Sequence, residues 1–179
     1  MGEKTKMDQT IQYGDGDALC AELWRLGVHF VNSATGSTAQ EIAPVDLLCG
    51  LAASQDARVQ LAIIPLLLTL PTFAEVLPES ANRLSGEPRV LLMCYAQAAA
   101  LLQRKHAEHL LALNRLPQWL PTPFSAALDL PASSPEEQLN ALAQRQGRLS
   151  GETIDWLATY EQVAARMLAR WAWEAECAA

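Results

Sequence analysis

The amino-acid sequence predicts an all-α protein, a compact bundle of six to eight helices around a buried, proline-broken central helical segment, residues 56–77. Half of the 179 residues are hydrophobic but only 6% are aromatic. Alanine and leucine, both good helix formers, supply most of the apolar content. Runs of valine, isoleucine and threonine, which strands favour, are missing. The central segment has no charged side chain from Val59 to Ala74, so we expect it to be hidden from water.

The chain is expected to consist of a flexible leader, residues 1–16, and a single all-helical domain, residues 17–179. A chain of this length buries about 70% of its extended surface and needs no disulfide or metal for stability. The leader lacks the apolar core of a signal peptide, and the apolar run 59–70 is too short to span a bilayer. None of the cysteines forms a C-x-x-C motif. We therefore expect a cytoplasmic protein with reduced thiols, no cofactor, no metal and no membrane contact.

The first two helices are expected at residues 17–27, where Gly27 stops the helix, and at about 44–53, where apolar residues fall at helical spacing. Asp56 is the expected N-cap of the central helix. Pro65 lies inside that helix, where a proline removes one backbone hydrogen bond and clashes with the preceding turn. We therefore expect a kink or a break into two short helices. Pro71 is expected to begin another short helix that Pro78 ends.

The longest helix is expected from Pro88 to about Asn114, followed by a proline-rich connection, residues 116–133. Ser134-Pro135-Glu136-Glu137 is a complete helix start, with an N-cap serine, a proline at the first helical position and a capping-box glutamate. That helix is expected to end at Gly147. Ser150 is the expected cap of the final helix, which runs to about Glu176. The apolar side of the final helix repeats at helical spacing: Leu157, Tyr160, Ala164, Met167, Leu168 and Trp171.

The charge balance argues against general nucleic-acid binding. The net charge is −7, with three lysines and ten scattered arginines, whereas affinity for nucleic acid comes largely from basic residues that neutralise phosphates. A local basic pocket stays open as an alternative. The same scarcity of basic residues argues against an electrostatic membrane anchor.

Four aromatic residues of the final helix are candidates for a protein interface: Trp156, Tyr160, Trp171 and Trp173. Tyr160 falls on the core side, Trp156 at the boundary, and Trp171 and Trp173 on different sides of the helix. At least one tryptophan is therefore expected to be exposed in a lone monomer, and exposed tryptophan is enriched at interfaces. The alternative is that Trp173 packs on the N-terminal leader.

Arg104 and His109 carry an alternative, enzymatic interpretation. Their spacing resembles that of HEPN ribonucleases, small all-helical proteins in which an arginine and a histidine act together on the scissile phosphate. Arginine can bind a phosphate oxygen, and histidine can move a proton near neutral pH. That family usually has Asn, Asp or His after the arginine, where this chain has Lys105. The two residues would otherwise form an ordinary basic helix end.

Three further features carry weaker functional alternatives. His106 and His109 have a spacing that can share a metal ion, but no cysteine or histidine pair elsewhere completes a zinc site. Cys94 lies among leucines, which indicates packing and not reactivity. An apolar cavity near Tyr95 and Trp156 would favour a small-molecule pocket.

The segments 54–68 and 149–161 resemble a group of uncharacterised bacterial all-helical proteins, and the resemblance covers about Val45 to Arg170. It carries no activity and no catalytic residue. Genes of that group often lie beside nucleotidyltransferase-like genes, so the resemblance implies a protein partner, with a nucleotidyltransferase-like protein as a candidate. HEPN proteins often accompany nucleotidyltransferases too. We expect a non-enzymatic cytoplasmic interaction or regulatory protein, acting through a helical surface as a homodimer or with a partner protein. The alternative is a HEPN-like or toxin-type ribonuclease that uses Arg104 and His109.

Overall fold

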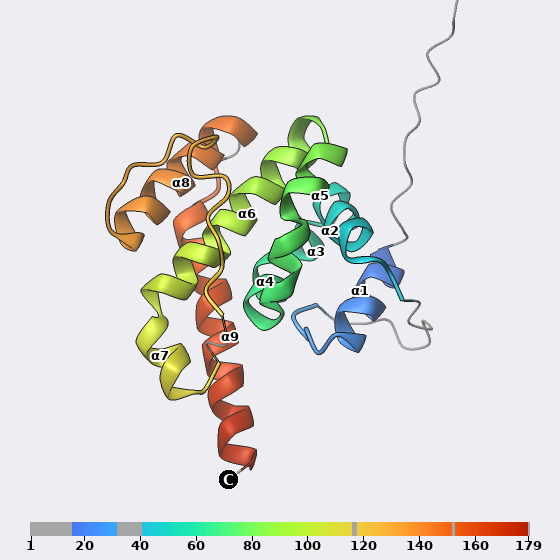
Figure 1. Ribbon diagram of the computed structural model, residues 1–179, viewed down its shortest axis with the longest axis vertical. Helices are drawn as coiled ribbons and strands as arrows, with labels where there is room; N and C mark the ends of the chain where they lie inside the picture. Colours follow the sequence, from blue (N-terminus) through green and yellow to red (C-terminus); the bar gives the residue numbers. More distant parts are fainter. Residues whose placement is uncertain (1–15, 32–40, 116–117, 152, 179) are drawn as a thin grey trace, which may run out of the picture.

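The computed structural model describes residues 16–31, 41–115, 118–151 and 153–178, so the expected leader lies outside the described residues except for Gly16. Every regular element in these ranges is helical (Figure 1), which confirms the all-α prediction. In chain order the elements are α1 (Gly16–Arg25), α2 (Pro44–Ala53), α3 (Ala57–Leu61), α4 (Ile63–Thr69), the 3-10 helix η1 (Pro71–Val76), α5 (Leu77–Arg83), α6 (Gly86–Lys105), α7 (Ala107–Ala112), α8 (Pro135–Ser150) and α9 (Trp156–Ala178).

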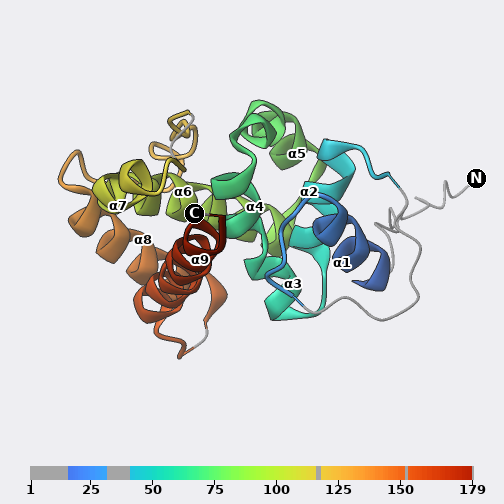
Figure 2. The same ribbon diagram turned by 90° about the horizontal axis from the view of Figure 1, so that it is seen from below.

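The apolar central segment lies inside the bundle, as the sequence predicts. Ile63, Leu66 and Leu67 of α4 have no exposed surface. Figure 2 shows α4 between α9 on one side and the group of α1, α2 and α3 on the other. The long helix α6 packs against α8, α4 and α2, so one hydrophobic core joins the described helices.

The central segment is broken into short helices as expected, but the first break lies at Ala62 and not at Pro65. Pro65 is the third residue of α4, where a backbone N–H has no partner within the helix in any case. Ending α3 at Leu61 removes the clash between the proline ring and the carbonyl four residues earlier. Pro71 begins η1 as expected. The expectation that Pro78 ends a helix is wrong, because this proline occupies the first turn of α5, another position where its missing N–H costs nothing.

The described helices differ from a membrane span in length and composition. None of them alone is long and apolar enough to cross a membrane. Only the pair Ala57–Thr69 and Pro71–Arg83, whose arms are bent by 115° at their junction, meets the length and composition requirement when both arms are taken together.

The helix that the sequence predicts to be the longest ends earlier than expected, and α9, with 23 residues, is longer than α6, with 20. α6 stops at Lys105, the helix is interrupted at His106, and α7 continues in a new direction (Figure 1). The ammonium of Lys105 lies 2.6 Å from the carboxylate of Glu161 on α9, which fixes the end of α6 against α9. The change of direction also brings Leu110 into the core.

The junction between α8 and α9 differs from the prediction in one respect. The capping box of Ser134 and Glu137 is confirmed. However, α8 continues past Gly147 to Ser150, and Gly151 ends it with a φ of 68°, a left-handed conformation that glycine adopts without strain. Ser150 is therefore the last residue of α8 and not the cap of α9. The carboxylate of Asp155 caps α9 by accepting a hydrogen bond from the Ala158 N–H at 3.0 Å.

Candidate functional site

The structure separates the four candidate interface residues into two groups. Trp156, Tyr160 and Trp171 lie in the core, each less than a tenth exposed, whereas Trp173 is 64% exposed. Trp24 is also exposed. The expectation that at least one tryptophan is exposed in a lone chain is confirmed, and among the four candidates this residue is Trp173.

The buried aromatic residues join α9 to α6 and α8. The ring centroid of Trp156 lies 6.3 Å from that of Tyr95 and 6.5 Å from that of Tyr160. The Tyr160 hydroxyl donates a hydrogen bond to Oε1 of Gln146 on α8. Burial raises the pKa of Tyr160 well above its ordinary value, with smaller contributions from Cys94 and Tyr95, so this hydroxyl stays protonated. These contacts give the cluster a role in holding the helices together.

The opposite side of α9 faces water, and we call it the outer face of α9. Because successive helical residues turn by about 100°, the residues that lie opposite the buried Trp171 fall on one side. All of them are exposed: Ala158, Gln162, Ala165, Arg166, Ala169, Trp173 and Glu176. Figure 1 shows the last turns of α9 projecting beyond the other helices. The spacing of these alanines along the chain could have revealed the face from sequence, but the aromatic residues alone do not.

Polar contacts hold both edges of the projecting helix. Arg170 donates to the carbonyl of His29 at 3.1 Å and contacts Nδ1 of the same histidine. Burial and then the charge of Arg170 lower the pKa of His29, so a neutral imidazole faces the guanidinium. The Glu174 carboxylate lies 2.7 Å from Nε of Arg170 and 2.8 Å from Nη2 of Arg115. The Arg115 guanidinium carbon lies 5.6 Å from the centroid of the Trp171 ring.

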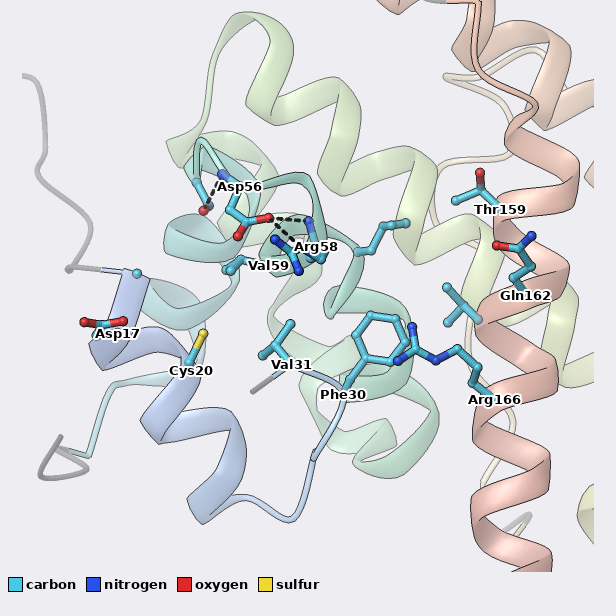
Figure 3. Close-up of a pocket in the computed structure, with 14 residues that line it drawn as sticks. Asp17, Cys20, Phe30, Val31, Asp56, Arg58, Val59, Thr159, Gln162 and Arg166 are labelled. Carbon is cyan, nitrogen blue, oxygen red and sulfur yellow. Dashed lines mark hydrogen bonds and ion pairs between the residues drawn. The ribbon is translucent and has the colours of Figure 1, made fainter. Parts of the chain in front are cut away.

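A cavity of about 430 Å³ lies beside this helix, between α1, α3 and α9 (Figure 3). Its volume is in the range of small-molecule sites. From α9, Arg166 reaches across to the Phe30 ring, 5.0 Å from its centroid. At the N-cap of α3, the Asp56 carboxylate accepts a hydrogen bond from the Arg58 backbone N–H at 2.8 Å and lies 3.7 Å from Nε of the Arg58 guanidinium. The described residues that line the cavity include no histidine. Burial raises the pKa of the lining thiol Cys20, so this thiol is not activated as a nucleophile.

Arg104 and His109 lie on either side of the break at His106. Nη2 of Arg104 donates to the carbonyl of Leu120 at 3.3 Å. His109 is exposed on α7, with its ring 6.5 Å from that of His106. Neither Arg104 nor His109 lines the cavity between α1, α3 and α9. RNA cleavage by Arg104 and His109 stays an alternative prediction.

The remaining chemical candidates are the metal ligands and the thiols. Within the described ranges, no group of three or more His, Cys, Asp or Glu residues could hold a metal ion. All four cysteines are free thiols, and only Cys177 is exposed. Burial raises the pKa of Cys94 to about 12, so this thiol packs in the core without becoming a nucleophile.

Comparisons of the chain with protein-family models, curated proteins and solved structures found no match. A function is therefore inferred from the geometry of the described residues. In that geometry, the outer face of α9 and the adjacent cavity are the two candidate sites.

Proposed function

We propose that this chain is a non-enzymatic interaction protein that binds a protein subunit through the outer face of α9. The observation that carries the proposal is the 64% exposure of Trp173 on a projecting helix. Covering about 150 Å² of an indole would contribute about 4 kcal/mol at about 25 cal/mol per Å². Tryptophan is also one of the residue types enriched among interface hot spots.

The composition of the same face supports a helix as the partner element. Ala158, Ala165 and Ala169 are exposed and carry only a methyl group, so a second helix can approach closely. Long charged side chains, which would keep a partner at a distance, occupy only Arg166 and Glu176 of this face. The proposed setting is the cytoplasm, and the resemblance noted in the sequence makes a nucleotidyltransferase-like protein one candidate partner.

The test compares Trp173→Ala with Trp119→Ala, a matched control because Trp119 is 52% exposed on a different segment. Light scattering and sedimentation velocity would follow each variant alone and mixed with the product of the adjacent gene. We expect assembly to be lost with Trp173→Ala and kept with Trp119→Ala. A wild-type chain that stays strictly monomeric and binds nothing would refute the proposal.

RNA cleavage is tested separately, with purified protein and total RNA. We expect no cleavage above that of a buffer control. Cleavage that disappears in His109→Ala and persists in His106→Ala would overturn the non-enzymatic proposal, because it would assign the chemistry to the Arg104 and His109 pair.

A further inference from the structure

The outer face of α9 is complementary in size to its own copy. In an antiparallel pair of identical helices related by a two-fold axis, the residue numbers of facing positions have a constant sum. An axis that sets Trp173 of one copy against Ala169 of the other therefore repeats this contact on its second side. Each Trp173 indole then lies over the Ala169 methyl group of the other copy. The nearby side chain of Ala172 is also small, and it is half-buried. Small residues at the crossing point allow the two helix axes to come close.

The same axis pairs opposite charges. It places Arg166 of each copy level with Glu176 of the other copy, so this pair of opposite charges occurs twice. Within the described ranges, neither side chain has a salt-bridge partner of opposite charge, although Arg166 stands over the Phe30 ring. A parallel pair would instead set Arg166 against Arg166 and Glu176 against Glu176. Because charged pairs at the rim of an interface decide orientation, the charge pattern favours the antiparallel arrangement.

We propose that the occupant of the outer face of α9 is a second copy of this chain, with the two α9 helices antiparallel. This inference rests on the proposed function and names its partner. The overlap from Ala165 to Cys177 is about 18 Å long, which gives a small interface of the kind found in transient complexes. We therefore expect a dissociation constant in the micromolar range.

The first experiment is sedimentation velocity of the full chain from about 1 to 500 μM, a range chosen to bracket that affinity. Wild type is expected to convert from monomer to dimer within this range. Trp173→Ala is expected to weaken dimerisation by on the order of 30-fold or more, and Trp119→Ala to leave it unchanged. Thermal unfolding of each variant checks that the fold is kept.

The second experiment tests the orientation by charge reversal. Arg166→Glu and Glu176→Arg, each alone, place like charges together twice and are expected to weaken the dimer about tenfold. The equimolar mixture of the two variants restores two opposite-charge pairs in an antiparallel heterodimer, so the wild-type affinity is expected to return. Arg148→Glu, an exposed reversal on α8, is the matched control and is expected to have no effect.

The outcomes separate this inference from the proposed function. A wild-type monomer up to about 500 μM, single reversals without effect, or a mixture that fails to recover would each overturn the antiparallel dimer. If the chain stays monomeric but loses binding to the nucleotidyltransferase-like protein in Trp173→Ala, the proposed function stands and the second copy is the wrong partner. If Trp173→Ala changes neither association, both proposals fail.

Discussion

Gln103 provides the sharpest test of how the connection between α7 and α8 is held. This α6 side chain is 1% exposed. Its Nε2 donates to the Gln118 carbonyl at 2.8 Å, and its Oε1 accepts from the Leu120 N–H at 2.7 Å. Gln103→Leu keeps the apolar part of the side chain but removes both bonds. A buried polar group without a partner costs about 1–3 kcal/mol. Gln118 is exposed, so water can replace part of the hydrogen bond that its carbonyl loses. We therefore expect Gln103→Leu to lower the free energy of unfolding by a total of about 2–4 kcal/mol.

Urea and thermal unfolding measure this loss. For a domain of this size, each kcal/mol lowers the Tm by about 2–4 °C, so we expect a decrease of roughly 4–16 °C. The slope of the urea transition should stay unchanged, because the same surface is exposed on unfolding. Gln144→Leu, at an exposed position of α8, is the control. A loss for Gln103→Leu no larger than that of the control would refute the reasoning, since the two hydrogen bonds would then contribute nothing measurable.

Three further predictions concern stability and thiol chemistry. Gly147→Ala should stabilise the protein by about 0.5–1 kcal/mol in thermal unfolding, because the added methyl group would lie in ordinary contact with the Trp156 ring, 3.7 Å away; a lower Tm would show that this site is overpacked. Ellman's reagent at about pH 8, near the ordinary thiol pKa, should modify one thiol rapidly in the folded protein, and Cys177→Ser should abolish this fast phase, because the other cysteines are buried. The hydrogen bond from Arg25 lowers the pKa of Glu22, so the carboxylate stabilises the folded state above its unfolded pKa and loses this effect as the pH falls through the folded pKa. Glu22→Gln should therefore be less stable than wild type at neutral pH, and a urea series should show the difference shrinking below about pH 4.

The sequence predicts those parts of the fold that depend on local chemistry. The N-cap at Asp56 and the capping box at Ser134 are both present, because each needs only residues within one turn of helix. Burial of the central segment follows from its lack of charge. The break at Ala62 does not follow from the sequence pattern, because a proline is tolerated in the first turn of a helix. The chain therefore ends the preceding helix early and keeps Pro65 in the next one.

Other features depend on contacts between distant segments. No local pattern marks the break at His106; it coincides with the contacts of Lys105 and His106 to Glu161, more than fifty residues later. Trp156 is buried because it is the first residue of α9 and packs against Tyr95 and Gly147 from two other helices. The expectation that Trp156 lies at the boundary is therefore wrong. Trp171 and Trp173 could be separated from sequence, since they lie within one helix whose inner face is clearly apolar.

The composition of the outer face of α9 supports the proposal that a partner covers it. An outer face that only met water would be expected to carry many long charged side chains, which favour helix formation and keep a surface free of contacts. The outer face of α9 instead presents Arg166 and Glu176 as its charged side chains, with Gln162 and three alanines beside Trp173. A helix that needed Trp173 for its own packing would bury it, as it buries Trp171 two positions earlier. This face combines an exposed indole, small neighbours and two charges of opposite sign that have no salt-bridge partner among the described residues. Such a surface suits another helix, and its pattern matches an inverted copy of itself.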